Sequence, residues 1–149
     1  MVNLFSDREL FARLIQCEAG GEGEDGLKAV ATVVMNRSTI SYGEFSRIND
    51  GGSIRNVIMQ PGQFVCAMTT IGGQYNSQNI YNMNPTQEHY DIVDWAMSGG
   101  RLAGVDNALF FYNPYSTHCR NYFPSSVGVI HNRIGNHCFY IPTMQYAKT

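Results

Sequence analysis

The sequence contains no long hydrophobic segment and no strong excess of either charge. A membrane-spanning helix needs about 18 or more consecutive apolar residues, and no stretch of this chain approaches that length. The formal net charge of -2 gives no reason to expect a nucleic-acid partner. The first residues, MVNLFSDREL, lack a basic segment followed by an apolar one. We therefore predict no membrane span, no nucleic-acid partner and no secretory signal peptide.

Charged residues are also few. They make up 15% of the 149 positions, whereas hydrophobic residues make up 44%. Disordered chains show the opposite balance, so this composition indicates a globular core. We find no internal repeat and no linker, and the length suits one domain. We therefore predict a single domain over residues 1–149.

Cysteine is scarce, and no two cysteines form a C-x-x-C pair. Two of the four directly follow a histidine, which is the arrangement in this chain closest to a zinc site. We expect small buried thiols instead and predict no metal or other cofactor. Four cysteines allow three complete disulfide pairings, but without a signal peptide we expect reduced thiols. The residues concerned are Cys17, Cys66, His118-Cys119 and His137-Cys138.

Helical signals dominate the first two thirds of the chain. Ser6 with Glu9 forms a capping box for a helix that ends near Ala19, where Gly20-Gly21 follow. The spacing of apolar residues predicts further helices over residues 25–37, 54–59 and 85–98, the last with Asn84 as N-cap and Pro85 at the first helical position. Residues 38–52 and 70–85 are polar and predict loops.

Strand signals are confined to the C-terminal third. Residues 108–112 form a short apolar and aromatic run, and residues 127–134 and 137–141 flank Gly135-Asn136. That dipeptide suits the two-residue turn of a β-hairpin. Helices first and strands last indicate the α+β class, with a helical core and a small C-terminal β-hairpin or sheet.

Glu18 is the carboxylate in the least ordinary setting. On a helix it continues the apolar stripe of Phe11, Leu14 and Ile15. Burial and the negative end of the helix dipole both disfavour the charged carboxylate, so we predict a raised pKa for Glu18. A carboxylic acid that stays protonated near neutral pH can act as a general acid. The alternative is a solvated side chain at a frayed helix end.

The neighbouring acids have simpler interpretations. Glu24 and Asp25 are expected to stabilise the positive N-terminus of the second helix. Glu22 lies in the glycine loop, where it could face either a functional site or solvent. His137 could orient a carboxylate, although we expect a structural histidine.

Four motifs occur in order along nearly the whole chain. They are CEAGGEGEDGLKAVATVVMNR (17–37), VIMQPGQF (57–64), ALFFYNP (108–114) and IGNHCFYIPT (134–143). The first resembles the signature E-A-x-G-E-x-x-x-G-x-x-x-V-x-x-V-x-x-N-R of the SleB/CwlJ family of spore cortex-lytic cell-wall hydrolases. The second resembles the family motif I-x-x-P-x-x-F, and the other two resemble its aromatic and C-terminal motifs. The last motif and the compact length are most similar to the CwlJ branch.

The resemblance implies a fold similar to lysozyme and lytic transglycosylase domains. It implies cleavage of the glycan strands of spore cortex peptidoglycan during germination. It places the catalytic acid at Glu18 and the second signature glutamate at Glu22. It also implies a location at the boundary of spore coat and cortex, synthesis in the mother-cell cytoplasm, and a spore-coat protein as a partner.

The number of suitable carboxylates favours one mechanism. Hydrolysis of a glycan normally uses two carboxylates, whereas a lytic transglycosylase can use one as acid and then as base. Only Glu18 has a suitable predicted environment, so we predict a lytic transglycosylase. If Glu22 points into the cleft, a muramidase or glucosaminidase that uses both residues becomes the alternative.

Four further residues are predicted to contact the substrate: Gln63, Phe64, Tyr112 and Asn113. Amide side chains can bond N-acetyl groups, and tyrosine combines an apolar ring with a polar tip. The alternative for Phe64 is a core ring. We expect Asn36 and Arg37 to tie down the second helix and leave them out of the site.

Two other functions are compatible with the sequence. A cysteine-dependent amidase or peptidase could use Cys17, although the C-terminal end of a helix does not activate a thiol. A non-catalytic module could bind glycan without cutting it.

Overall fold

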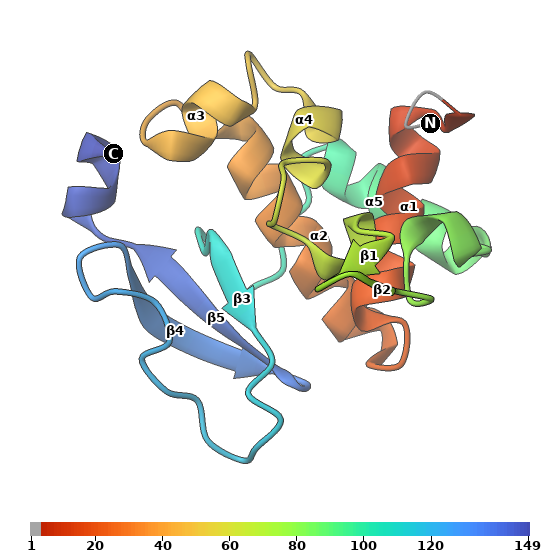
Figure 1. The fold of residues 1–149 in the computed structure, drawn as a ribbon. Helices are drawn as coiled ribbons and strands as arrows, with labels where there is room; N and C mark the ends of the chain where they lie inside the picture. The colour runs from red at the N-terminus through yellow and green to blue at the C-terminus, as the bar shows by residue number, and fades with distance from the viewer. Residues whose placement is uncertain (1–3) are drawn as a thin grey trace.

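The computed structural model describes residues 4–149 and combines a helical body with a small sheet (Figure 1). Helices precede the sheet in the chain, so the α+β prediction is confirmed. Residues 1–3, which begin the segment considered for a signal peptide, lie outside the described residues. Over residues 4–149, no helix has both the length and the apolar character needed to cross a membrane. The helices are α1 (Asp7–Ala19), α2 (Gly23–Thr39), α3 (Glu44–Ile48), α4 (Ile54–Ile58) and α5 (Gln87–Met97).

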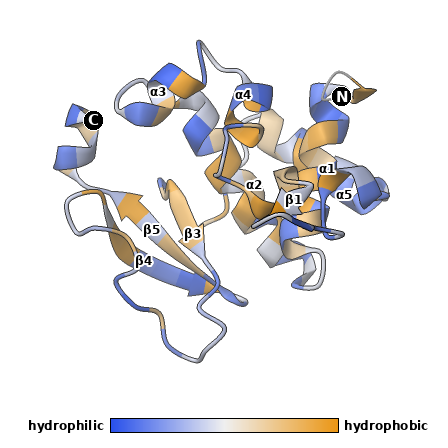
Figure 2. Ribbon diagram, in the orientation of Figure 1, coloured by the Kyte–Doolittle hydropathy of each residue, from blue (hydrophilic) through white to orange (hydrophobic). Residues whose placement is uncertain are grey.

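Helix α2 lies between the other helices and the sheet, which explains why it is apolar on two sides. Its residues Leu27, Val30 and Val34 belong to the main core with α1 and α5. Ala29 and Val33 instead pack against the sheet residue Phe139. Apolar positions accordingly recur around α2 and on the strands facing it (Figure 2). The helix predicted over residues 25–37 is thus the central helix of the fold.

Helix boundaries follow the predicted caps at α1 but not at α5. The Ser6 hydroxyl accepts a hydrogen bond from the Glu9 amide at 3.1 Å, as the capping box predicts. Helix α5 begins at Gln87, so Asn84 is not its N-cap and Pro85 is not its first helical residue. The Asn84 backbone amide instead donates to Gln16 Oε1 of α1 at 3.0 Å. Thr86 caps α5 instead, in a capping box with His89.

The two segments predicted as loops contain short regular elements. The first, residues 38–52, includes α3. The second contains the two-residue strands β1 (Thr70–Ile71) and β2 (Gln74–Tyr75), and ends in the 3₁₀ helix η3 (Ile80–Asn82). A further 3₁₀ helix, η2 (Val65–Ala67), precedes this second segment. Such short elements have too few residues to show a periodic pattern in the sequence.

The sheet contains β3 (Phe110–Tyr112), β4 (Gly128–Ile134) and β5 (His137–Pro142). Both edge strands pair with the central β5 in antiparallel fashion. Gly135 begins the β4–β5 turn with a φ of 58°, so the hairpin predicted at Gly135-Asn136 is confirmed. Because side chains alternate along a strand, Phe111 and Phe139 face α2, while Phe110 and Tyr140 face the opposite side.

All four cysteines are paired, which corrects the expectation of reduced thiols. Cys17 bonds to Cys66, and Cys119 bonds to Cys138. The fold brings the Cα atoms of these pairs to 6.0 and 5.8 Å, within the range that a disulfide spans. The two cysteines that follow histidines are therefore bonded to each other and offer no free thiolate. Within residues 4–149, no group of three or more His, Cys, Asp or Glu side chains is placed to hold a metal ion.

Gly43 is required where the C-terminal turn packs on α3. It has a φ of 75°, and a Cβ atom there would lie 2.2 Å from the ring of the buried Tyr146. We expect Gly43→Ala to lower the free energy of unfolding by about 2–4 kcal/mol, because it adds both backbone strain and a clash. Gly51→Ala is the matched control, since Gly51 has a φ of 83° but open space around it. Urea denaturation that gives equal losses for both variants would contradict the role assigned to Tyr146.

Candidate active site

A cleft of about 520 Å³ opens at the C-terminal end of α1. Its walls come from the end of α1, the glycine loop, the segment before α5, and the β4–β5 turn. Glu18 and Glu22 both lie in it, so the structure brings the two predicted carboxylates together. The lining residues are Gln16, Cys17, Glu18, Ala19, Gly20, Gly21, Glu22, Gln78, Met83, His89 and Asn136.

The carboxyl of Glu18 has the electrostatic setting that its sequence position predicts. The apolar stripe that leads to it is fully buried at Phe11, Leu14 and Ile15. Burial raises the pKa of Glu18 from 4.5 to about 7, and the nearby negative charge of Glu22 adds to this rise. The backbone amide of Cys66 and the positive charge of Arg37 oppose it. Glu18 is therefore poised to exchange a proton near neutral pH, not a solvated group at a frayed helix end.

Arg37 has a structural and an electrostatic role. Its Nε donates to the Leu109 carbonyl at 2.7 Å and so ties α2 to the segment entering β3, as predicted. The guanidinium is almost fully buried over the rings of Phe45 and Phe64. Its charge also favours the ionised form of Glu18. The sequence pattern does not reveal this second role, because 18 residues of chain separate the two side chains.

Asn36 is structural, as predicted. Its side-chain amide donates to the carbonyls of Asp106 and Ala108 at 2.8 and 2.9 Å. Its oxygen accepts from Arg101 Nε at 2.9 Å. These bonds join α2 to the chain that leads into the sheet.

Glu22 faces the β4–β5 turn. Its Oε1 accepts a hydrogen bond from the Asn136 amide at 2.9 Å, and its Oε2 lies 2.9 Å from His137 Nδ1. The side chains of Glu22 and His137 are each only 9% exposed. His137 thus orients a carboxylate, the possibility that the sequence raised but did not favour. The Glu22 carboxylate joins the glycine loop to the sheet.

Of the predicted substrate contacts, Gln63 and Phe64 differ in exposure. Gln63 is exposed, and its Oε1 accepts from Arg37 Nη1 at 3.4 Å. Phe64 is only 2% exposed and its ring centroid lies 6.0 Å from that of Phe111. The structure therefore favours the alternative of a core ring, because Phe64 fills the interface between the helical body and the sheet, and a substrate contact by Phe64 stays a prediction.

Tyr112 and Asn113 lie apart from the cleft. The Tyr112 ring stacks on Tyr122 at a centroid distance of 3.8 Å, and its hydroxyl accepts from Arg120 Nη2 at 2.8 Å. Asn113 Oδ1 accepts from the Tyr115 amide at 2.8 Å. Tyr112 also lies on the sheet face opposite the one that Phe111 and its neighbour α2 share. A substrate contact by Tyr112 or Asn113 stays a prediction.

Several cleft residues carry no signal in the sequence. Gln78 comes from the segment 70–85, whose role the sequence left open, and its Nε2 donates to the Cys17 carbonyl at 3.3 Å. His89 belongs to the first turn of α5, and Asn136 to the hairpin turn. Each reaches the cleft only because its segment folds back onto the end of α1 or onto the glycine loop that follows it.

The fold is similar to solved structures of SleB catalytic domains. One is titled the catalytic domain of the germination-specific lytic transglycosylase SleB from Bacillus anthracis, with a TM-score of 0.62 and 26% identity. That match covers 93% of this chain and 98% of the other. The catalytic domain of Bacillus cereus SleB also matches with a TM-score of 0.62 and 26% identity, over 90% of this chain and 88% of the other.

Sequence comparison gives a consistent result. The cell wall hydrolase CwlJ of Oceanobacillus iheyensis is 28% identical over 91% of this chain and 86% of its own length. CwlJ of Bacillus subtilis is 25% identical over 94% of this chain and 88% of its own length. The family described as Cell Wall Hydrolase matches residues 21–140, a range that includes Glu22 and begins just after Glu18. Since this match covers well over half of the sequence, the chain belongs to the cell wall hydrolase family.

Proposed function

We propose that this protein is a spore cortex-lytic enzyme that cleaves the glycan strands of peptidoglycan during germination. We further propose that it acts as a lytic transglycosylase, with Glu18 as general acid and then general base. The proposal is supported by family membership and by the similarity to a domain titled as a germination-specific lytic transglycosylase.

The contrast between Glu18 and Glu22 is the observation that carries the mechanism. Glu18 has a pKa of about 7 and lines the cleft. Glu22 lines the same cleft, but its two oxygens already contact the Asn136 amide and the His137 ring. A hydrolase needs a second carboxylate to act as nucleophile or to activate water. The Glu22 carboxylate is poorly suited to that task because it is bonded to the β4–β5 turn. Glu18 is then the one acid left for the reaction.

A transglycosylase can complete its reaction with that one acid. Protonated Glu18 donates its proton to the glycosidic oxygen as the bond to the muramoyl C1 breaks. The resulting carboxylate then accepts the proton of the muramoyl 6-hydroxyl, whose oxygen closes the anhydro ring at C1. The Cys66 amide and Arg37 favour the transient carboxylate, while burial favours its reprotonation. A pKa near the working pH makes both forms accessible.

A glycosidase that uses both Glu18 and Glu22 is the second candidate. It is favoured by the position of Glu22 in the cleft and by its electrostatic influence on Glu18. A cysteine-dependent amidase is not supported, because the Cys17 sulfur is bonded to Cys66.

Product analysis tests the proposed function directly. Isolated cortex peptidoglycan would be digested with the protein, reduced with borohydride and analysed by mass spectrometry. We expect muramoyl ends that resist reduction, since an anhydro ring has no free aldehyde. Reducible ends would identify a hydrolase, and intact glycan at saturating protein would identify a binding module.

The proposed setting is the boundary of spore coat and cortex, with cortex glycan as substrate and a spore-coat protein as partner. The similarity to SleB, described as germination-specific, supports a role in the germinating spore. Fractionating spores and detecting this chain in the coat and cortex layers would test it.

Replacing Glu22 separates the two candidate mechanisms. We expect Glu22→Gln to retain glycan cleavage within about tenfold of wild type and to lose about 1–3 kcal/mol of unfolding free energy, because a charge-assisted contact to His137 is lost. Cleavage rates and urea denaturation provide the two measurements. Glu24→Gln is the control, since Glu24 is exposed in the first turn of α2. If Glu22→Gln is as inactive as Glu18→Gln while remaining folded, Glu22 takes part in the chemistry.

A further inference from the structure

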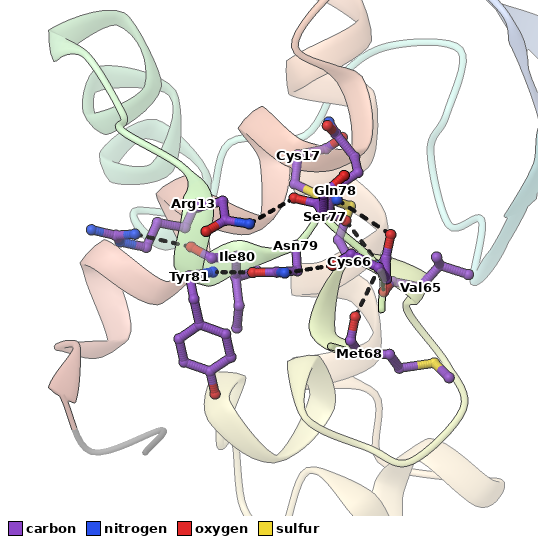
Figure 3. Close-up of a disulfide and its surroundings, with 12 residues drawn as sticks. Arg13, Cys17, Val65, Cys66, Met68, Ser77, Gln78, Asn79, Ile80 and Tyr81 are labelled. Atoms are coloured by element: carbon purple, nitrogen blue, oxygen red, sulfur yellow. Dashed lines mark hydrogen bonds between the residues drawn. A yellow bond between two sulfur atoms is a disulfide. The ribbon is translucent and has the colours of Figure 1, made fainter. Parts of the chain in front are cut away.

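The Cys17–Cys66 disulfide lies directly beside the catalytic acid of the proposed function. Cys17 precedes Glu18 in the last turn of α1, and Cys66 lies in η2. The bond joins segments 49 residues apart in the sequence (Figure 3). The backbone amide of its second partner, Cys66, lowers the pKa of Glu18 by favouring the carboxylate. One covalent bond thus connects the end of α1, which carries Glu18, to η2, which supplies the backbone amide that favours the Glu18 carboxylate.

A hydrogen-bond network closes around the same disulfide. Asn76 Nδ2 donates to the carbonyls of Val65, Met68 and Gln78 at 3.1, 2.9 and 3.1 Å. Gln78 Nε2 donates to the Cys17 carbonyl, and Gln78 lines the cleft. Figure 3 shows Gln78 between the end of α1 and η2. This network supports both ends of the disulfide, but only the disulfide joins them covalently.

We propose that the Cys17–Cys66 disulfide is a positioning element for Glu18, which holds η2 against the acid and makes efficient glycan cleavage depend on the oxidised state of this bond. The proposal rests on the proposed function of Glu18. This role of the disulfide is inferred from the contacts of Cys17 and Cys66 in this structure and not from family membership. Opening the bond leaves η2 held on α1 only by hydrogen bonds and by the apolar packing of the core, so the Cys66 amide is fixed less firmly.

The groups around Glu18 determine the sign of the effect. Burial and Glu22 raise the pKa of Glu18, whereas the Cys66 amide and Arg37 of α2 lower it. His89 of α5 lines the same cleft. The disulfide does not join the segments that carry Arg37, Glu22 and His89. Releasing η2 therefore removes mainly the influence of the Cys66 amide, and the pKa of Glu18 should rise further.

The redox step requires an ordinary dithiol. A dithiol such as dithiothreitol supplies two electrons and two protons, the S–S bond breaks, and Cys17 and Cys66 become thiols. The dithiol is oxidised to its cyclic disulfide. Oxidised glutathione reverses the change, since it takes up the two electrons and two protons and becomes two reduced molecules.

The two disulfides of the chain allow a matched comparison. The double variant Cys17→Ser/Cys66→Ser opens the bond beside Glu18, and Cys119→Ser/Cys138→Ser opens the other bond. For the first variant we expect kcat on cortex glycan to fall by about 10- to 100-fold with little change in KM, because small displacements of a catalytic group have effects of this size. The alkaline limb of its pH–rate profile should move to higher pH, because the pKa of Glu18 is higher. In Cys119→Ser/Cys138→Ser the alkaline limb should lie at the same pH as in the wild type.

A titration without substrate separates this proposal from the proposed function. Carbon-13 NMR of glutamate-labelled protein follows the Glu18 carboxyl, which is assigned by its loss in Glu18→Gln. We expect the pKa of Glu18 to be higher in Cys17→Ser/Cys66→Ser than in wild type, even if the wild type cleaves no glycan. Wild-type protein reduced under native conditions and alkylated at Cys17 and Cys66 provides a second sample.

Three outcomes would overturn the proposal. One is an unchanged pKa of Glu18 together with an unchanged cleavage rate in folded protein that lacks the bond. Another is an equal change in the Cys119→Ser/Cys138→Ser variant. The third is complete unfolding of both the variant and the reduced wild type, which would assign the bond to the fold as a whole.

Discussion

Replacing Glu18 with glutamine should lower the rate of glycan cleavage by about 10²–10⁴-fold, the range that a positioned general acid contributes. Glutamine has nearly the same shape and cannot donate a proton to the glycosidic oxygen. The rate of release of muramoyl products from cortex peptidoglycan measures the effect. Anhydro ends should be lost together with cleavage, since the same carboxylate also accepts the proton of the muramoyl 6-hydroxyl during ring closure.

A matched variant separates this effect from a general change in charge. Glu24→Gln also removes one carboxylate, but Glu24 is exposed and pairs with Lys28 at 3.2 Å on the surface of α2. Its cleavage rate should stay within about twofold of wild type, because surface pairs of this kind contribute little. Substantial cleavage by folded Glu18→Gln would show that another residue is the acid, and Glu22 would be the first to examine.

The same Glu18→Gln variant should be more stable than wild type above neutral pH. The pKa of Glu18 is 4.5 as an ordinary carboxyl and about 7 in the folded protein. Below about pH 4.5 the carboxyl is protonated in both states and contributes nothing to this difference. Above about pH 7 it is ionised in both states, and the folded protein carries the full cost of the buried charge. We expect Glu18→Gln to gain about 2–3 kcal/mol of unfolding free energy near pH 8 relative to its difference near pH 4.

Urea denaturation of wild type and variant at several pH values measures this gain. Glu24→Gln serves again as the control and should show no comparable dependence on pH. If the stability difference between wild type and Glu18→Gln is constant from about pH 4 to 8, the pKa of Glu18 is not raised. The general-acid role would then lose its electrostatic basis, whatever the activity of the variant.

The sequence by itself determined the local elements, because their signals lie in adjacent residues. The Ser6 and Glu9 pair defined the start of α1. Gly135-Asn136 defined the hairpin, since the two-residue turn needs a left-handed residue that glycine supplies. Helical periodicity also placed Glu18 on a buried stripe and so predicted the direction of its pKa change. Together with the order of the motifs, these signals were enough for the class and the family.

Only the tertiary structure decided which distant groups meet. The disulfide partners, the contact of Glu22 with His137, and the influence of Arg37 on Glu18 each join segments that are far apart in the chain. The burial of Phe64 against Phe111 likewise depends on how the sheet packs on the helices. A local pattern records whether a side chain faces inward, but not what lies opposite it. The raised pKa of Glu18 could therefore be predicted from the sequence, while the distant groups that surround its carboxyl could not.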